Sequence, residues 1–398
     1  MKSAEVADIF RRYGPSYREG HRLPLSHLRT MHAIETCRTA DLGGHVDECE
    51  ECGHIKISYN SCRNRHCPKC QFLKKEKWVE ARGKELLPIE YFHVVFTLPD
   101  ELNPLALRNR EVVYHILFKA ASETLTELAK KRLGAKAGFI AVLHTWGQNL
   151  MDHPHLHCLV TGGGLTPQNT WAGPKQARWL FPVHAVSDLF RGKFCAGLLQ
   201  LHATGQLQFH GQCQPLQPAN AFATLLRQVR ARRWVVFAKG SVVGPDAVLD
   251  YLGRYTHRVA ITNGRLRSLD PKARTLTFTY KDYADASRTK DLTLTGVEFI
   301  RRLRLHLLPR GFTKIRHYGL LGNNRRHRRV PQARAALVTS PLRFAPKPAP
   351  RPAPPPLTCP HCQGTDVRCI GRVERSGKVS LFARPWLSGL TPAYTETS

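Results

Sequence analysis

The sequence predicts an α+β fold in which an antiparallel sheet is covered by helices and preceded by a small cysteine-rich module. Two observations lead to this prediction. The middle of the chain alternates helical segments with short segments rich in aromatic and β-branched residues, as expected for a sheet with helices packed on it. Six of the twelve cysteines fall between Cys37 and Cys70, which sets the N-terminal region apart.

The expected elements follow from residue type and from residues that break helices and strands. A helix is expected over 74–87, because Pro88 ends it. A strand is expected over 91–98, because this apolar segment stops at Pro99. The other expected elements are helical segments at 104–133, 245–257 and 297–308, and strands at 138–146, 155–161, 275–283 and 291–294.

Two connecting segments carry their own signals. Residues 258–262 and 265–269 flank Asn263-Gly264, which predicts a hairpin with a type I′ turn. Residues 341–357 are rich in proline, which favours extended polyproline II geometry and predicts a linker.

The composition favours a polyanionic partner. The chain has 398 residues, with 60 Lys and Arg against 30 Asp and Glu, and a formal net charge of +30. Such a balance favours nucleic acid, because basic side chains release counterions from a phosphate backbone. An anionic membrane is the competing partner, but the basic residues are spread along the chain rather than gathered on one amphipathic helix.

The sequence shows neither a secretory signal nor an apolar run of the roughly 18–20 residues that a membrane span needs. A cytoplasmic, nucleoid-associated protein is therefore expected. In a reducing compartment, the twelve cysteines are expected to be metal ligands or buried thiols rather than disulfides.

The N-terminal cysteines include two CxxC pairs, Cys49 with Cys52 and Cys67 with Cys70, separated by fourteen residues. Each pair can present two thiolates to one tetrahedral Zn²⁺, so the four are expected to form a structural zinc site. The remaining residues of ligand type are candidates for a second zinc, the alternative being buried thiols and solvated imidazoles; they are Cys37, His45, Cys62 and His66. Arg63 and Arg65 lie among the knuckles and are expected to contact nucleic acid.

The C-terminal segment carries a third CxxC pair, Cys359 and Cys362, followed by Cys369. No Cys or His comes after these residues. This set is one ligand short of a tetrahedral site unless His361 contributes, so a partial knuckle is expected here.

A histidine motif gives the clearest chemical signal. In a strand His155 and His157 project from one face, and two imidazoles at this spacing can hold one metal ion. His144, on the preceding strand, is the first choice for a third ligand, with Gln148, Asp152 and Asp250 as rivals. Imidazole ligands favour zinc or manganese. The alternative is that these are ordinary strand histidines.

A pair of tyrosines, Tyr251 and Tyr255, lies four residues apart on one face of the expected helix. Both can be core aromatics, but Arg254 and Arg258 interleave with them, which suits the clamping of a phosphate. A metal site beside tyrosines in so basic a chain predicts chemistry on a nucleic-acid phosphate.

At this point the chain resembles the HUH single-strand endonucleases, named for His-hydrophobic-His, and within them the rolling-circle transposases of the insertion sequence 91 family. The segments that carry the resemblance are Ser61-Cys-Arg-Asn-Arg-His-Cys-Pro-Lys-Cys-Gln71, His144-Thr-Trp-Gly-Gln148, His153-Pro-His-Leu-His157, Tyr251-Leu-Gly-Arg-Tyr255-Thr-His-Arg258 and Leu308-Pro-Arg-Gly-Phe-Thr-Lys-Ile-Arg-His-Tyr-Gly319.

The resemblance implies an HUH-like catalytic domain and a mechanism. Mg²⁺ or Mn²⁺ held by His155, His157 and a third ligand would polarise the scissile phosphate. Tyr251 or Tyr255 would attack it, leaving a 5′-phosphotyrosine and a free 3′-OH on single-stranded DNA at the ends of the element. The implied organisation is a transposase zinc-binding module at 1–87, a catalytic domain at 88–335, and a linker with a basic tail at 336–398.

Two alternatives remain open. A plasmid replication initiator or relaxase would use the same chemistry, although the N-terminal zinc module argues against it. A non-catalytic zinc-dependent DNA-binding protein would need the histidines and tyrosines only for structure. The basic run that includes Arg325 and Arg326 is expected to contact DNA in either case, or is simply a solvated charge run.

Overall fold

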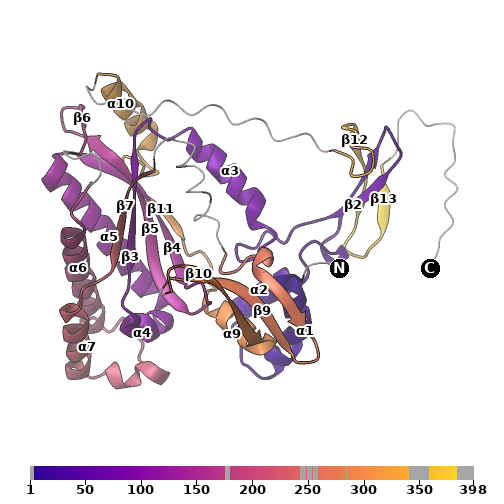
Figure 1. The fold of residues 1–398 in the computed structure, drawn as a ribbon, viewed down its shortest axis with the longest axis horizontal. Helices are drawn as coiled ribbons and strands as arrows, with labels where there is room; N and C mark the ends of the chain where they lie inside the picture. The colour runs from indigo at the N-terminus through magenta and orange to yellow at the C-terminus, as the bar shows by residue number, and fades with distance from the viewer. Residues whose placement is uncertain are drawn as a thin grey trace.

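The structure is a computed structural model that describes residues 4–174, 180–242, 248, 253, 259–283, 285–339 and 358–382, with the backbone alone at 71–74 and 239–242. The described strands form three antiparallel sheets, and helices pack against the six-stranded and the three-stranded sheet (Figure 1). The expected α+β class is therefore confirmed. Short 3₁₀ turns connect some elements: η1(Ala40–Leu42), η2(Asp100–Leu102), η3(Gly211–Leu216) and η4(Asn263–Arg265).

The central sheet is the largest of the three. Its strand order is β11-β4-β5-β3-β7, and the short β6 pairs with β5. Every pairing is antiparallel, so consecutive strands β4 and β5 lie side by side with His144 directly opposite His155. The bounds of its strands are β3(Tyr91–Thr97), β4(Lys136–Trp146), β5(Asp152–Leu165), β6(Trp171–Ala172), β7(Val236–Val242) and β11(Ile315–Gly319).

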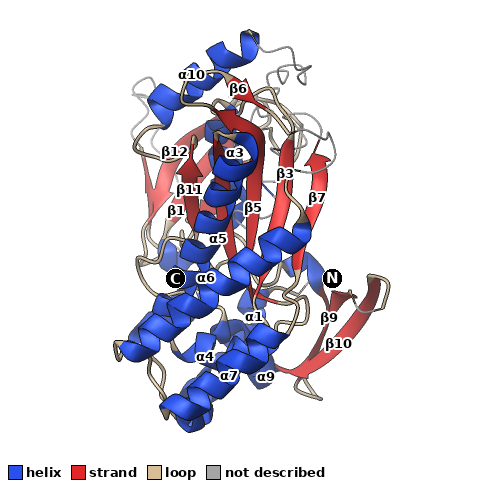
Figure 2. Cartoon of the chain, turned by 90° about the vertical axis from the view of Figure 1, so that its left-hand side faces the viewer, coloured by secondary structure: helices blue, strands red, loops and turns tan. Residues whose placement is uncertain are grey.

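One face of the central sheet is covered by helices. Because side chains alternate between faces along a strand, Phe96, Phe139 and Leu156 all point into this layer, where each is almost completely buried. Figure 2 shows α5, α6 and α7 in front of the strands. The covering helices are α4(Asn103–Arg108), α5(Arg110–Leu133), α6(Val183–Ala203) and α7(Ala219–Ala231).

The opposite face carries the histidines. Ile140, Val142 and Leu159 belong to a buried cluster on this face together with residues of α3(Gln71–Gly83) and α10(Arg326–Val338). Since His144 and His157 are two residues from Val142 and Leu159 in their strands, they project from the same side of the sheet.

A second core lies at one end of the central sheet. Helices α1(Val6–Glu19), α2(Leu25–Glu35) and α9(Gly296–Leu305) pack here with a three-stranded sheet, β8(Leu266–Asp270), β9(Thr275–Asp282) and β10(Arg288–Thr295). Trp146 and Leu150, at the end of β4 and just beyond it, are buried in the same core. The N-terminal helices are therefore built into the body of the molecule (Figure 1).

The third sheet joins the two ends of the chain. Its strand order is β13-β12-β1-β2, with bounds β1(Gly44–Cys49), β2(Ile55–Tyr59), β12(Val367–Val373) and β13(Val379–Leu381). In Figure 1 it lies on the side of the molecule away from α5, α6 and α7. The segment that the sequence analysis describes as a tail therefore supplies two strands, β12 and β13, to a sheet that also contains β1 and β2.

Most sequence-predicted elements are confirmed, with two corrections. The helix expected over 74–87 begins at Gln71 and ends at Gly83. The hairpin expected around Asn263-Gly264 is wrong: Asn263–Arg265 is a 3₁₀ turn, and β8 pairs with β9 instead. The reason is that Ile261 is buried in the second core, while Asn263 Oδ1 accepts a hydrogen bond from the Val6 amide at 3.1 Å. The helix expected over 245–257 lies outside the described residues, except for Val248 and Gly253.

Within the described part of the chain, no helix is long and apolar enough to span a membrane.

Candidate functional site

Three histidines converge on the face of the central sheet opposite α5, α6 and α7. His144 comes from β4, and His155 and His157 come from β5. One ring nitrogen from each lies within 4.8 Å of the others. His144 is buried, and the other two are half-buried. The structure therefore brings together the three residues that the sequence predicts. His144 joins the other two because the antiparallel pairing of β4 with β5 places it opposite His155.

The hydrogen bonds of the rings fix which nitrogen atoms face the centre. Nδ1 of His155 lies 2.6 Å from the carbonyl oxygen of His153, so it carries the proton and leaves a lone pair on Nε2. That Nε2 lies 3.1 Å from Nε2 of His157. Two ring nitrogen atoms directed at one position, each with its other nitrogen already bonded, are typical of imidazoles that bind a metal.

His93 of β3 is a site residue that sequence reasoning missed. Its Nε2 lies 2.9 Å from Nδ1 of His157, and its ring stacks on that ring with centroids 5.2 Å apart. It is only 7% exposed. A histidine inside the apolar strand 91–97 was the available signal, because an imidazole is rarely buried without a partner.

The other candidates for the third ligand are Gln148, Asp152 and Asp250. The amide of Gln148 donates to the hydroxyl of Tyr283 at 3.4 Å. Asp152 is outside the three-histidine group; burial raises its pKa to about 6 against the opposing effect of Arg110. Asp250 lies outside the described residues. The donor set that the structure offers to a divalent ion is thus three imidazole nitrogen atoms, which suits manganese or zinc more than magnesium.

The tyrosine motif lies outside the described residues, as do Arg254 and Arg258. Two residues within that segment are described. Val248 is helical and fully buried in the cluster that includes Val142 and Leu159, on the histidine face of the sheet. Gly253 is helical and lies against α3, where an added Cβ would come within 2.6 Å of Lys75 Cε.

The cysteines form two four-residue groups, and their composition corrects the sequence prediction. One group is Cys37, Cys62, Cys67 and Cys70, and the other is Cys49, Cys52, Cys359 and Cys362; within each, the Sγ atoms lie within 4.8 Å of one another. The expected pairing of the first CxxC with the second CxxC in one site is therefore wrong. The β1–β2 hairpin carries the first CxxC at its tip, toward the C-terminal segment. The second CxxC instead meets Cys37, two residues beyond the end of α2.

Only two of the four residues expected to bind a second zinc belong to one of these cysteine groups. Cys37 and Cys62 are ligand candidates, but in the group with the second CxxC. His45 lies 3.3 Å from Asp47, with its side chain about half exposed. His66 is in neither group; burial lowers its pKa to about 3, and the charge of Arg65 adds to this effect.

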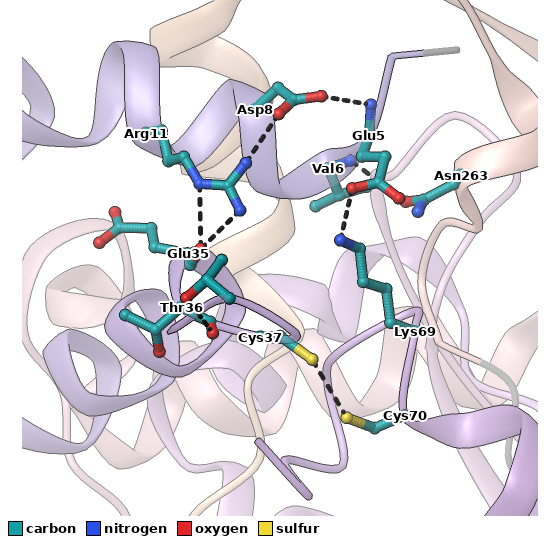
Figure 3. A network of polar contacts seen from close by, with 11 residues as sticks. Glu5, Val6, Asp8, Arg11, Glu35, Thr36, Cys37, Lys69, Cys70 and Asn263 are labelled. Carbon is teal, nitrogen blue, oxygen red and sulfur yellow. Dashed lines mark hydrogen bonds and ion pairs between the residues drawn. The ribbon is translucent and has the colours of Figure 1, made fainter. Parts of the chain in front are cut away.

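The group around Cys37 lies inside the second core. Cys70 Sγ is 3.4 Å from Cys37 Sγ and 3.5 Å from Cys62 Sγ. Figure 3 shows how the surrounding polar contacts tie this knuckle to α1, through the ion pair of Lys69 with Glu5 at 2.5 Å. The same figure shows Asn263 bonded to the start of α1, so one helix end contacts both the knuckle and the 3₁₀ turn.

Comparisons with known proteins decide the family. Residues 138–329 match the family model described as "Putative transposase", and residues 9–98 match the one described as "Transposase zinc-binding domain". "Putative transposase y4qJ" of Sinorhizobium fredii (strain NBRC 101917 / NGR234) is 51% identical over 337 residues, 84% of either chain. "Transposase for insertion sequence element IS801" of Pseudomonas savastanoi pv. phaseolicola is 30% identical over 349 residues, 84% of this chain and 81% of its own. This chain belongs to the insertion sequence 91 family of transposases. No solved structure matches it.

The family gives meaning to the buried cysteine group. All four of its residues lie within the part of the transposase that matches the zinc-binding domain. Four thiols at these distances suit tetrahedral Zn²⁺. The buried group therefore fits the structural Zn²⁺ that the zinc-binding domain implies, and membership of the transposase family implies binding to DNA.

The arginines expected to contact DNA differ in their surroundings. Arg65 donates to the carbonyl oxygen atoms of Phe312 at 2.6 Å and Pro309 at 2.5 Å, and burial lowers its pKa. Its guanidinium therefore joins the cysteine-rich segment to the loop after α9. Arg63 is exposed.

The two arginines near α10 of the transposase also differ. Arg325 is exposed and borders a hollow of about 470 Å³, which its neighbours Arg328 and Arg329 also line. Arg326 lies 3.3 Å from a carboxylate oxygen of Glu85. Of this pair, Arg325 is thus the one whose guanidinium faces solvent in a basic surface.

Proposed function

We propose that this transposase nicks and rejoins single-stranded DNA through a covalent 5′-phosphotyrosine intermediate, as in rolling-circle transposition. The observation that supports the proposal most directly is the convergence of His144, His155 and His157 on one position. A purely structural role would not require two Nε2 atoms to face each other at 3.1 Å.

The three histidines would hold Mn²⁺ or Mg²⁺, with Mn²⁺ the better match to imidazole ligands. When bound, such an ion supplies a positive charge that polarises the scissile phosphate and stabilises charge in the transition state. His93 and the carbonyl group of His153 hold the rings of His157 and His155 in the orientation that presents Nε2.

Tyr251 or Tyr255 would be the nucleophile. The phenolic oxygen attacks phosphorus and loses its proton, a tyrosine–phosphorus bond forms, and the bond to the 3′ oxygen breaks and leaves a 3′-OH. Attack by a 3′-OH on the phosphotyrosine reverses these changes and rejoins the strands without another energy source, because the phosphoester bond is conserved. Two tyrosines would allow the protein to hold two DNA ends in succession.

The surroundings of the tyrosine motif support this assignment. Val248 packs among side chains on the histidine face of the sheet. The helix that the sequence predicts over 245–257 would place Tyr251 and Tyr255, three and seven positions after Val248, on the same side as that residue. Arg254 and Arg258 are proposed to bind the phosphate.

The test uses a single-stranded oligonucleotide from an element end, Mn²⁺, and separate labels at the 3′ and 5′ ends. We expect an SDS-resistant adduct that carries only the 3′ label, because a 5′-phosphotyrosine keeps the DNA downstream of the nick. The adduct should disappear in the double variant Tyr251→Phe, Tyr255→Phe and persist in Tyr283→Phe, which alters an exposed tyrosine. An adduct that carries the 5′ label, or that survives the double substitution, would refute the proposal.

The same experiment separates the alternative functions. A non-catalytic zinc-dependent DNA-binding protein would form no adduct at all. A plasmid replication initiator or relaxase would form one but would fail to join the ends of an element. The names of both relatives, and the zinc-binding module, favour transposition.

A further inference from the structure

We propose that Cys49, Cys52, Cys359 and Cys362 bind a second structural Zn²⁺, which fastens the C-terminal hairpin to the N-terminal sheet. This group lies partly beyond the matched zinc-binding domain, which ends at residue 98. The site would make the two ends of the chain a single metal-bound unit, referred to below as the clasp.

The geometry of the clasp suits zinc. Cys49 Sγ lies 3.6 Å from Cys362 Sγ, and Cys52 Sγ lies 3.6 Å from Cys359 Sγ. Around a tetrahedral ion with Zn–S bonds of about 2.3 Å, sulfur atoms are separated by about 3.8 Å. All four cysteines are free thiols, at sulfur separations far beyond the ~2.05 Å of a disulfide.

The two halves of the clasp share one backbone pattern. In the first, the Cys49 amide donates to His54 O at 3.0 Å and the Gly53 amide donates to Cys49 O at 2.8 Å. In the second, the Cys359 amide donates to Gly364 O at 2.8 Å and the Gln363 amide donates to Cys359 O at 3.0 Å. Gly53 and Gln363 both have positive φ, +70° and +63°.

In the second half, backbone amides also face the sulfur atoms. The His361 amide lies 3.4 Å from Cys359 Sγ, and the Gly364 amide lies 3.4 Å from Cys362 Sγ. Such contacts favour the thiolate form that binds zinc. The two turns therefore match each other, and their sulfur atoms face each other although Cys49 and Cys362 are 313 residues apart. Each turn supplies two of the four ligands that a tetrahedral site needs.

The sheet that carries the clasp has too small a core to hold itself together. Among the described residues of its four strands, the buried apolar side chains are Val46, Cys49 and Val373. Ile57 and Leu381 are exposed instead. Small modules without a sufficient hydrophobic core depend on a metal or a disulfide, so the pairing of β1 with β12 is expected to require the ion.

Hydrogen bonds beside the clasp orient its two halves but contribute little to its stability. The Glu50 amide donates to Asp366 O at 2.9 Å, and a carboxylate oxygen of Glu51 accepts from the Thr365 amide at 2.9 Å.

The two cysteine groups differ in their exposure to solvent. Cys52 and Cys362 are exposed, whereas Cys37, Cys67 and Cys70 of the other group are buried. A chelator should therefore reach the clasp before it reaches the buried zinc.

The experiment uses the full chain with a specific protease site inserted into the proline-rich stretch 341–357. We expect two zinc ions per chain by elemental analysis. After cleavage, the C-terminal fragment should elute with the rest of the protein in gel filtration and should separate when a chelator is added. A fragment that separates before chelation, or that stays bound after all zinc is removed, would overturn the proposal.

The double variant Cys359→Ser, Cys362→Ser should retain one zinc and release the fragment without a chelator. Cys369→Ser is the matched control, because this exposed cysteine of β12 lies in neither group and should leave two zinc ions in place. A single zinc in the unaltered protein, or no loss of zinc in the double variant, would also overturn the proposal. The cleavage result on the unaltered cysteines does not depend on how the variants fold.

Discussion

Nε2 of His93 lies 2.9 Å from Nδ1 of His157, so a buried histidine on β3 holds the ring of a proposed metal ligand on β5. The two rings stack almost parallel, at 12°. His93 is not in the group of three converging histidines. We therefore propose that His93 is a positioning residue, whose contribution can be separated from that of the ligands.

The first prediction concerns this pair. His93→Ala should weaken the affinity for Mn²⁺ by about 10–100-fold, because loss of a partner that orients a ligand typically has this effect. Nicking should recover at high Mn²⁺, as measured by adduct formation across a metal titration. His115→Ala, an exposed histidine on α5, is the control. A defect that no concentration of metal restores would place His93 in the chemistry itself.

The second prediction concerns a proposed ligand. His155→Ala should abolish nicking while binding to single-stranded DNA survives, because basic side chains supply most of the affinity. Adduct formation and a binding titration on the same preparation measure the two effects. If binding and folding are lost together with nicking, His155 is structural and the metal site is wrong.

The third prediction separates a structural arginine from a DNA contact. Arg65→Gln should lower the free energy of unfolding by about 1–3 kcal/mol, because backbone carbonyl groups that it satisfies would be left half-buried without a donor. Arg267→Gln, which changes an exposed arginine of β8, should have little effect on stability. Denaturant unfolding checks both. Equal stability of the two variants would contradict the structural role of Arg65.

The fourth prediction is a pH dependence. Burial lowers the pKa of His306 to about 4, where its ring contacts Leu150 O at 3.0 Å. Between pH 6.5 and 4 the unfolded chain binds this proton and the folded chain does not, so stability should fall as pH falls through that window, by at most about 3 kcal/mol. Below pH 4 both states are protonated and this contribution to the slope ends.

Unfolding measured at several pH values in His306→Gln checks the fourth prediction. The variant should be less stable near pH 7 and should show a flatter slope between pH 6.5 and 4. His184→Gln, an exposed histidine on α6, is the control and should keep the original slope. An unchanged slope in His306→Gln would assign the acid sensitivity to other groups.

The fifth prediction concerns the basic surface at α10. If Arg325 contacts a DNA phosphate, Arg325→Gln should reduce the slope of log affinity against log salt by about 0.7 for a single strand. Arg191→Gln is the control, because Arg191 already pairs with Asp188 at 3.0 Å. Parallel salt titrations of both variants decide the point, and equal slopes would remove Arg325 from the DNA path.

Local patterns predicted the central sheet and the histidine group well. Runs of apolar, aromatic and β-branched residues mark β3, β4 and β5, and a period of two places His155 and His157 on one face. His144 could be proposed as their neighbour because consecutive strands usually pair. His93 could not, because its strand lies next to β5 only through a pairing between segments far apart in the sequence.

The partners of the cysteines could not be read from spacing. A CxxC pair indicates that two thiols can bind one ion, but it does not indicate which other pair completes the site. In this fold, β1 extends Cys49 and Cys52 away from Cys67 and toward residues that follow more than 300 positions later. Only the register of β1 with β12 reveals that partner.

The pairing of β1 with β12 also has a consequence for biosynthesis. The ribosome makes Cys49 early and reaches Cys362 after 313 further residues, a delay of roughly 15–60 s at usual elongation speeds. Throughout that interval the first hairpin waits with one edge uncovered. A polypeptide released before β12 is made would lack the strand that pairs with β1 and could not form the four-stranded sheet.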